Sequence, residues 1–418
     1  MKDCFEIIGG NKLYGEIVNQ TSKNATLPIM AATILVGGGV ELREIPDISD
    51  VANMVEILRG LGADVSRRES VLNINTTDIT NTAITNELAS SMRSSIFLLG
   101  PILSRFKKMD LPMPGGCKIG CRPIDIHIGA LSRLGVKIKC VGDRINFDAE
   151  GAHSGKVRLR LPSVGATENI ILFACLLRGK TTIFNPAREP EVVDLANFLN
   201  QMGAKVLGAG TKKITIYGVD KLRSTIYTPM GDRIVSGTLM TAVACCGGDL
   251  TITRACPYQN EKFIKILCSL GCQIDIKNDI IHISRDRELT SNMSISTDYY
   301  PGFPTDLQSG LLALACSTKG EMVIREKIFE NRFLLVDELR KMGAEVKTLS
   351  NRKVRVTGVE RLVGAEVDAL DLRGGAALVL AGLMAEGTTT IKNVHFIDRG
   401  YDHLEEMLTS IGANIRRI

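Results

Sequence analysis

The 418-residue chain has few of the features that mark membrane, secreted or nucleic-acid-binding proteins. No apolar run approaches the roughly 20 residues that a membrane-spanning helix needs, and the segment Met1–Glu6 has no apolar core of a signal peptide. The net charge is only +5, and the basic residues form neither a run nor a single stripe. These absences predict a cytoplasmic protein that does not enter a membrane and does not bind nucleic acid through charge alone.

Histidine is scarce, whereas cysteine is not. The five histidines offer no matching pair for a zinc site beside the cysteines. The eleven cysteines are odd in number and scattered through apparent helices and strands. That distribution favours reduced thiols, most of them small core residues, over a disulfide framework.

The chain does contain a repeat that fills its whole length. A short phrase with a central glycine returns six times, and the successive glycines lie 73, 68, 68, 72 and 69 residues apart. A fixed period of this length indicates one supersecondary unit copied six times. The six phrases occupy residues 61–65, 134–138, 202–206, 270–274, 342–346 and 411–415.

Each unit is expected to hold two helices of different character. The helix before each glycine is amphipathic, as in residues 192–201, and the glycine ends it. A second helix earlier in the unit is apolar nearly all round and should therefore be buried. A strand such as Thr181–Phe184 runs between the two. The six expected buried helices span residues 25–35, 95–103, 166–177, 238–246, 307–316 and 374–385.

The sixth unit ends at Ile418, six residues after Gly412, and so lacks the final strands of the others. Residues 5–13 have the pattern of residues 214–222 and supply what is missing. We therefore predict two domains of three repeats each. One is continuous, residues 23–230, and the other joins residues 1–22 to residues 231–418. Two chain crossings predict a hinge, with ligands in a cleft between the domains.

Polar residues stand at the start of each expected buried helix. Helix N-termini carry unpaired amides and partial positive charge, so with lysine and arginine beside them they can receive phosphate or carboxylate groups. The alternative is that these residues are ordinary caps and surface charges. The residues are Lys23, Asn24, Arg93, Ser163, Val164, Gly165, Arg233, Asp306 and Arg373.

The second unit carries an insertion, residues 112–123, whose glycines and prolines exclude a helix or a regular strand. We expect a loop that presents Cys117 close to Lys118 and Arg122, two cations that favour the reactive thiolate. Two alternatives remain: a metal site with Cys121, from the Cys-x3-Cys spacing, and a purely structural buried cysteine.

Asp306 is one of the few acids among the basic helix starts. It follows a proline turn, so it could be only an N-cap, or it could serve as a general base acting on a substrate hydroxyl. Arg332 and Arg399 lie at strand-to-helix turns, each close to an acid in the sequence. Simple surface salt bridges are the alternative for these two arginines.

The loop at residues 114–127, with Lys23-Asn24 and residues 329–333, 371–373 and 398–401, resembles the UDP-N-acetylglucosamine 1-carboxyvinyltransferase family of enolpyruvyltransferases. The resemblance covers the whole chain. It implies an α/β fold of two inside-out α/β domains, each of three repeats. It also implies the first committed step of bacterial peptidoglycan synthesis, with no metal or organic cofactor. We further expect a monomer.

The reaction that the resemblance implies joins the 3-hydroxyl of UDP-N-acetylglucosamine to C2 of phosphoenolpyruvate. C3 is protonated, and phosphate then leaves a tetrahedral intermediate. By similarity, Cys117 is the proton donor and can hold a covalent phosphoenolpyruvate adduct, while Asp306 is the base near the sugar hydroxyl. Fixed cationic groups suit a trianionic substrate, because preorganised charges need no reorganisation during the reaction.

The resemblance also implies binding residues. Lys23, Arg122 and Arg399 would hold the phosphate and carboxylate of phosphoenolpyruvate, with Arg93 and Arg373 nearby. Asn24 would lie beside the sugar, and Arg332 belongs to the same substrate-binding set. Uridine, diphosphate and sugar would be held by Arg122, Pro123, Ile124, Asp125, Ile126, His127, Ser163, Val164, Gly165 and Ile328.

Two stretches depart from the usual family pattern, Thr21-Ser22 in place of Gly-Ala and residues 231–237. They leave open whether this is the main enzyme of its organism or a second copy. A rival enzyme is the shikimate-pathway enolpyruvyltransferase, which would lack the cysteine loop and resist the thiol-alkylating epoxide fosfomycin. A rival of another class is a ring that encircles nucleic acid. Such a ring would need basic residues along its inner helices, whereas here charge stands only at their starts.

Overall fold

The computed structural model describes residues 3–83, 93–112 and 124–418. The described residues form two compact units. Residues 3–20 and 231–418 make up the discontinuous unit, and residues 21–83, 93–112 and 124–230 make up the continuous unit. Each unit is described by itself below.

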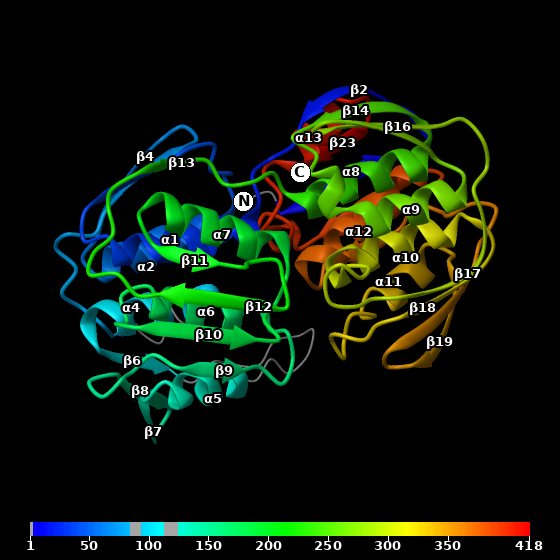
Figure 1. The fold of residues 1–418 in the computed structure, drawn as a ribbon. Helices are drawn as coiled ribbons and strands as arrows, with labels where there is room; N and C mark the ends of the chain where they lie inside the picture. Colours follow the sequence, from blue (N-terminus) through cyan, green and yellow to red (C-terminus); the bar gives the residue numbers. More distant parts are fainter. Residues whose placement is uncertain (1–2, 84–92, 113–123) are drawn as a thin grey trace. The chain divides into compact units, whose positions relative to one another are not determined.

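One repeat of the continuous unit shows the common plan. The chain runs through β9 (Lys156–Arg158), α6 (Val164–Ala174), β10 (Lys180–Phe184), α7 (Pro190–Gln201), β11 (Lys205–Leu207) and β12 (Lys213–Tyr217) (Figure 1). The sheet order is β11-β12-β10-β9. The pair β9–β10 is parallel, and the other two pairs are antiparallel.

The same order of one parallel and two antiparallel pairs recurs in four other sheets. In the continuous unit, the recurring sheet is β13 (Ile226–Tyr227), β3 (Gly39–Leu42), β5 (Val71–Asn75), β4 (Asp64–Arg68). In the discontinuous unit, the first sheet is β15 (Gln273–Lys277), β16 (Ile280–Arg285), β14 (Gly248–Thr253), β2 (Leu13–Val18). The second is β17 (Thr290–Ser296), β18 (Lys319–Arg325), β20 (Lys353–Thr357), β19 (Glu345–Ser350). The third is β21 (Glu366–Asp368), β22 (Thr388–Lys392), β1 (Cys4–Ile8), β23 (Asn414–Arg417).

The sixth sheet has three named strands, β6 (Lys108–Pro112), β8 (Arg144–Asp148) and β7 (Lys137–Val141). In this sheet, a parallel bridge between Ala83 and Asp110 takes the place of the parallel strand pair found in the other five sheets. The recurrence confirms the six copies of one α/β unit that the glycine period predicts.

Both ends of the chain take part in one sheet of the discontinuous unit. Strand β1 lies between β22 and β23 and pairs antiparallel with both. It holds the place that the last strand of a repeat holds in the other sheets. Strand β2 pairs parallel with β14 along its whole length. The N-terminal segment thus belongs to two sheets of this unit.

The inner helices are buried and the sheets lie around them. In the discontinuous unit, α8 (Arg233–Cys246), α10 (Gln308–Cys316) and α12 (Leu372–Met384) pack on one another. The contact is close, because a Cβ atom on Gly237 would lie 2.5 Å from the side chain of Leu307. The inner helices of the continuous unit are α1 (Lys23–Ala32), α4 (Leu99–Phe106) and α6. Helices inside and sheets outside are the inside-out arrangement that the resemblance implies.

The repeated glycines end the outer helices, as predicted. All six have positive φ, from 84° at Gly343 to 124° at Gly271. The residue after each glycine donates its amide to a carbonyl five residues earlier, as Ala63 does to Leu58 at 3.0 Å. This is the Schellman bond of a helix C-terminus, which requires the left-handed conformation that glycine adopts freely. The outer helices are α2 (Ser49–Gly60), α5 (Asp125–Arg133), α7, α9 (Glu261–Leu270), α11 (Val336–Lys341) and α13 (Leu404–Thr409).

Four inner helices, α1, α6, α8 and α12, begin earlier than the apolar pattern predicts. Helix α8 starts at Arg233, five residues before the expected Thr238, because the Asp232 carboxylate accepts the amides of Ile234 and Val235. Asp371 caps α12 in the same way. Two other inner helices are preceded by 3₁₀ turns, η2 (Arg93–Leu98) and η4 (Thr305–Leu307). The polar residues at the helix starts therefore lie within the first turn.

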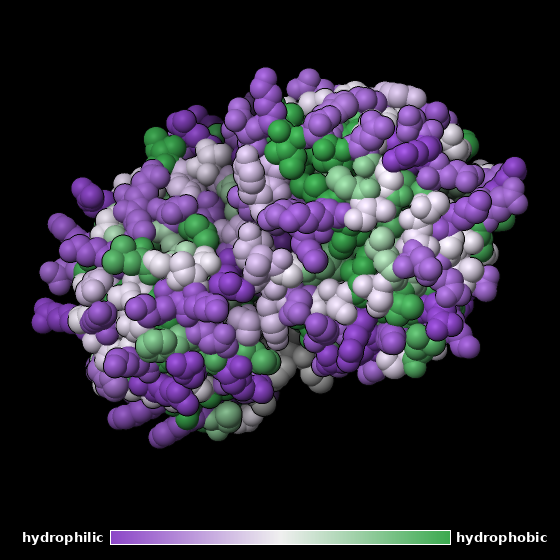
Figure 2. Space-filling view, turned by 45° about the vertical axis from the view of Figure 1, so that its right-hand side comes forward, coloured by the Kyte–Doolittle hydropathy of each residue, from purple (hydrophilic) through white to green (hydrophobic). Residues whose placement is uncertain are grey.

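The described surface is mainly polar. Hydrophilic side chains cover much of the face in Figure 2, with hydrophobic ones showing between them. No helix in the described part of the chain has the length and apolar character needed to cross a bilayer. The nine cysteines within the described residues are all free thiols, and five of them are buried. Most therefore act as core residues, as predicted.

Candidate functional site

The Asp306 carboxylate is the centre of a buried charge network in the discontinuous unit. Its Oδ1 accepts a hydrogen bond from Arg332 Nη2 at 2.5 Å, and its Oδ2 accepts one from Arg373 Nη2 at 3.3 Å. The two arginine side chains are only 3% and 4% exposed, whereas that of Asp306 is 25% exposed. The N-cap interpretation of Asp306 is therefore wrong, since Pro304 holds the cap position of η4. The surface salt-bridge interpretation of Arg332 is wrong as well.

Arg373 stands in the first turn of α12 and is held from several sides. Its guanidinium lies 5.6 Å from the ring centroid of Tyr401, whose hydroxyl pairs with Thr238 Oγ1 of α8 at 2.8 Å. Burial by itself would lower the pKa of Arg373, but the charges of Asp306, Tyr401 and Asp232 outweigh it and raise the pKa above its ordinary value. Groups on or beside the starts of all three inner helices thus act on one cation.

The turn that carries Arg399 lies next to the same charge network. It is half-buried in the turn between η5 (Val394–Phe396) and α13, two residues before Tyr401. Because Tyr401 packs against Arg373, the turn that carries Arg399 is part of the structure around Asp306. The structure therefore brings together Asp306, Arg332 and Arg373, with the Arg399 turn adjoining them.

Glu326 connects Asp306 to the segment that carries Ile328. Its carboxylate is 1% exposed and accepts hydrogen bonds from the Thr305 hydroxyl at 2.9 Å and from the amides of Ile328 and Phe329 at 2.6 and 3.1 Å. Sequence reasoning missed this residue. The only signal was an acid directly after strand β18, and its partners come from two separate turns.

Replacing Glu326 by alanine is expected to destabilise the protein by about 2 kcal/mol, because two buried amides and a hydroxyl lose their acceptor. Glu326→Gln keeps one carbonyl acceptor and should cost less. Urea unfolding measures both variants. The matched control is Glu321→Ala on the neighbouring strand β18, a 52% exposed side chain whose loss should change stability by less than about 0.5 kcal/mol. Equal costs for Glu326→Ala and Glu321→Ala would refute the connecting role.

Lys23 begins α1 in the continuous unit and forms a buried ion pair. Its Nζ lies 2.7 Å from Asp50 Oδ2, with side-chain exposures of 10% and 1%. Asp50 lies in the first turn of α2, and sequence reasoning missed it as well. Asn24 is half-buried next to Lys23, and α1 packs against η2, which begins at Arg93. The predicted residues of these two helix starts thus belong to neighbouring elements.

The structure also brings two predicted stretches of the continuous unit together. Ile124, Asp125, Ile126 and His127 form the start of α5, and Ser163, Val164 and Gly165 form the start of α6. A Cβ atom on Gly165 would lie only 3.1 Å from His127 Nε2, so the ring lies directly against the α6 start. The Ser163 hydroxyl caps α6 by accepting the Ala166 amide at 3.4 Å. The N-terminus of α6 carries partial positive charge, which suits an anion.

Burial governs the ionisation of His127. It lowers the pKa of His127 to about 4, although the charge of Asp125 and the backbone of Gly165 oppose the change. The ring is therefore neutral at physiological pH. A neutral imidazole can take part in hydrogen bonds to a sugar or a base but adds no positive charge for a diphosphate.

Lowering the pH should destabilise the continuous unit through His127. Between the unfolded pKa of about 6.5 and the lower folded pKa, the unfolded chain binds more protons than the folded one. The free energy of unfolding therefore decreases as the pH is lowered through this range. The loss at about pH 5 should reach about 2 kcal/mol relative to neutral pH. Urea unfolding of the wild type and of His127→Gln at both pH values measures this loss. An equal pH dependence in the two proteins would contradict it.

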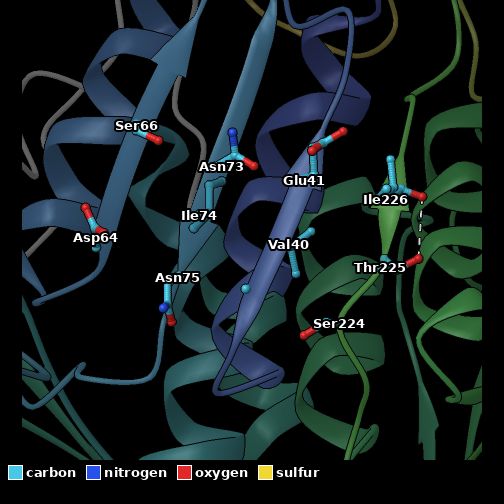
Figure 3. A pocket seen from close by; sticks show the side chains of 11 residues that line it. Val40, Glu41, Asp64, Ser66, Asn73, Ile74, Asn75, Ser224, Thr225 and Ile226 are labelled. Carbon is cyan, nitrogen blue, oxygen red and sulfur yellow. Dashed lines mark hydrogen bonds between the residues drawn. The ribbon is translucent and has the colours of Figure 1, made fainter.

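Three predicted residues, Cys117, Arg122 and Pro123, lie outside the described residues. One hollow in the continuous unit involves none of the predicted site residues. It encloses about 390 Å³ along β3, β4, β5 and residues 224–226, and its lining includes the carboxylates of Glu41 and Asp64 (Figure 3). An acidic lining does not suit an anionic substrate. Within the ranges that the structure describes, no group of His, Cys, Asp and Glu could hold a metal ion.

The fold and the charged helix starts agree with comparisons to known proteins. Residues 7–408 match the family described as EPSP synthase (3-phosphoshikimate 1-carboxyvinyltransferase). The enolpyruvyl transferase NikO from Streptomyces tendae has a similar structure, with a TM-score of 0.88 and 25% identity over 100% of this chain and 99% of that one. EPSP synthase from Acinetobacter baumannii shares the fold, with a TM-score of 0.75 and 19% identity over 99% of each chain. The chain is therefore a member of the enolpyruvyltransferase class.

Curated relatives define the family more closely. The UDP-N-acetylglucosamine 1-carboxyvinyltransferase 2 of Caldanaerobacter subterraneus subsp. tengcongensis is 45% identical over 99% of both chains. The UDP-N-acetylglucosamine 1-carboxyvinyltransferase of Geobacter metallireducens is 39% identical over 100% of this chain and 99% of its own. The chain belongs to the UDP-N-acetylglucosamine 1-carboxyvinyltransferase family.

Proposed function

We propose that the protein transfers the enolpyruvyl group of phosphoenolpyruvate to the 3-hydroxyl of UDP-N-acetylglucosamine and releases phosphate, as a step of peptidoglycan synthesis. The observation that carries this proposal is identity of 39–45% along the full chain to relatives that bear the name of this activity. The cationic helix starts support it, because both substrates are anions.

Asp306 is the proposed base for the sugar hydroxyl. Each of its oxygens accepts an arginine hydrogen bond, and the side chain remains 25% exposed to solvent. The charge-assisted bonds fix the carboxylate in one orientation, as proton abstraction requires. Arg332 and Arg373 are thus positioned both to orient the base and to offset negative charge of the substrates.

The remaining roles follow the family resemblance. Cys117 delivers the proton to C3 of phosphoenolpyruvate. Lys23, Arg122 and Arg399 bind its phosphate and carboxylate, with Arg93 and Arg373 nearby, and Asn24 contacts the sugar. The starts of α5 and α6, Ile124 to His127 and Ser163 to Gly165, bind the uridine diphosphate together with Arg122, Pro123 and Ile328. A monomer in the cytoplasm remains the expectation, and light scattering after size exclusion measures the mass.

Phosphate release tests the proposed function directly. Phosphate should appear when phosphoenolpyruvate and UDP-N-acetylglucosamine are supplied together and not with either alone, and mass spectrometry should find the enolpyruvyl ether of the sugar nucleotide. Asp306→Asn serves as the inactive control protein. If the wild type releases no phosphate with both substrates, the proposed function is wrong.

A second acceptor, 3-phosphoshikimate, deserves a test because the matched family description names it. We expect no phosphate release with 3-phosphoshikimate in place of the sugar nucleotide.

Fosfomycin should inactivate the wild type by alkylating Cys117 and should leave Cys117→Asp unmodified, which peptide mass spectrometry detects. Turnover with 3-phosphoshikimate, or an unmodified Cys117, would favour the rival enzyme.

A further inference from the structure

The side chain of Gln20 holds the turn that carries Arg399. Its Nε2 donates to the carbonyl oxygen of Gly400 at 3.1 Å, and its Oε1 accepts the amide of Asp402 at 2.9 Å. One primary amide thus fixes two peptide groups directly after Arg399. The contact spans 380 residues of sequence and lies within the discontinuous unit.

The backbone around Gln20 is itself anchored to the start of α8. The carbonyl oxygen of Gln20 accepts the amide of Asp232 at 2.8 Å. The side chain of Asn19 donates to the carbonyl oxygens of Asp232 and Arg254, both at 3.0 Å. Asp232 is the N-cap of α8 and one of the charges that act on Arg373. Gln20 therefore connects the Arg399 turn to a fixed point of the charge network.

The other flank of Arg399 is also held. The guanidinium of Arg417 pairs with both oxygens of Asp398 and, through Nε, with Glu405 at 3.0 Å. It lies 4.9 Å from the ring centroid of Phe5. Arg417 thus holds Asp398 on one side of Arg399, and Gln20 holds the peptide groups on the other side, next to Tyr401.

We propose that Gln20 is a positioning residue for Arg399. This inference rests on the proposed function, in which Arg399 binds an anionic group of phosphoenolpyruvate. A long arginine side chain can meet an anion only from a backbone whose position is fixed, and a displacement of about 1 Å can cost up to about 100-fold in rate. Glutamine suits this place because it offers both a donor for Gly400 and an acceptor for Asp402.

Gln20→Ala removes both hydrogen bonds and should raise the KM for phosphoenolpyruvate about tenfold. The KM for UDP-N-acetylglucosamine should stay within about twofold, because the two hydrogen bonds of the Gln20 side chain go to the Arg399 turn and not to the proposed sugar-nucleotide residues of the α5 and α6 starts. Gln20→Glu keeps the acceptor for Asp402 and should show a smaller rise. The matched control is Asn11→Ala, which removes a similar amide contact from the same segment to Gly412 at 3.2 Å.

A double variant distinguishes an effect of Gln20 on the position of Arg399 from a general loss of structure. If Gln20 acts through Arg399, Gln20→Ala should cause no further rise in the phosphoenolpyruvate KM once Arg399→Ala is present. A rise of the same size in both backgrounds would overturn the inference. So would unchanged kinetics in Gln20→Ala, given an active wild type.

Trypsin gives a readout that needs no turnover, because it cleaves after Arg399. Gln20→Ala should be cut there several-fold faster than the wild type or Asn11→Ala, as peptide mass spectrometry of a time course would show. Equal cutting would overturn the inference whatever the activity. If the wild type releases no phosphate while Gln20→Ala is cut faster, the proposed function fails and the hold on the Arg399 turn stands.

Discussion

Replacing Asp306 by asparagine is expected to lower kcat by at least about 100-fold, because general-base catalysis typically contributes about 100- to 10,000-fold. Asparagine has nearly the same shape and retains an oxygen that can accept a hydrogen bond from Arg332 or Arg373, but it cannot take the proton of a substrate hydroxyl. Phosphate release under saturating substrates measures the change. The wild type and the variant should bind UDP-N-acetylglucosamine with similar affinity.

The stability of Asp306 variants distinguishes the base from a mere counter-ion. Asp306→Ala leaves two arginine side chains, 3% and 4% exposed, without their shared carboxylate. Removal of one partner from a buried ion pair costs roughly 3–5 kcal/mol. Asp306→Asn should cost less, since its amide oxygen still accepts a bond. Asp337→Asn is the control, because that carboxylate is 81% exposed and pairs with Arg340 on the surface. An Asp306→Asn protein with more than half the wild-type kcat would leave Asp306 a structural role only.

The repeat plan could be predicted because it depends on local sequence. A glycine with positive φ ends every outer helix, and an apolar stretch forms every inner one. Such signals act within one or two turns of a helix and are therefore visible in the sequence. The exact starts of α8 and α12 were missed by a few residues because Asp232 and Asp371 cap them from outside the apolar pattern.

Ion pairing could not be predicted from neighbours in the sequence. Glu330 stands two residues before Arg332, yet it pairs with Arg352, while Arg332 pairs with Asp306. Similarly, Asp398 pairs with Arg417. Side chains two positions apart in a turn diverge, so the partner of a buried cation is chosen by the fold. For the same reason the sequence did not reveal the partners of Glu326, which lie on two separate turns.

The pair Lys23–Asp50 allows stability and activity to be separated within the continuous unit. Asp50→Ala should destabilise the protein by roughly 3–5 kcal/mol, because it removes the carboxylate that lies 2.7 Å from the buried Lys23 ammonium. Lys23→Met should cost a similar amount, since it removes the cation that pairs with a carboxylate only 1% exposed. Urea unfolding measures both. Glu56→Ala, at an exposed pair with Arg59, should change stability by less than about 0.5 kcal/mol.

The double variant Lys23→Met/Asp50→Leu should recover much of the lost stability, because apolar pairs often replace buried ion pairs without cost. It should not recover activity, since the proposed role of Lys23 is to bind an anionic group of phosphoenolpyruvate. A phosphoenolpyruvate KM raised at least about tenfold in this stable double variant would separate binding from folding. If the double variant regains both stability and wild-type kinetics, Lys23 serves only to hold α1 against α2, and phosphoenolpyruvate must be bound by the arginines alone.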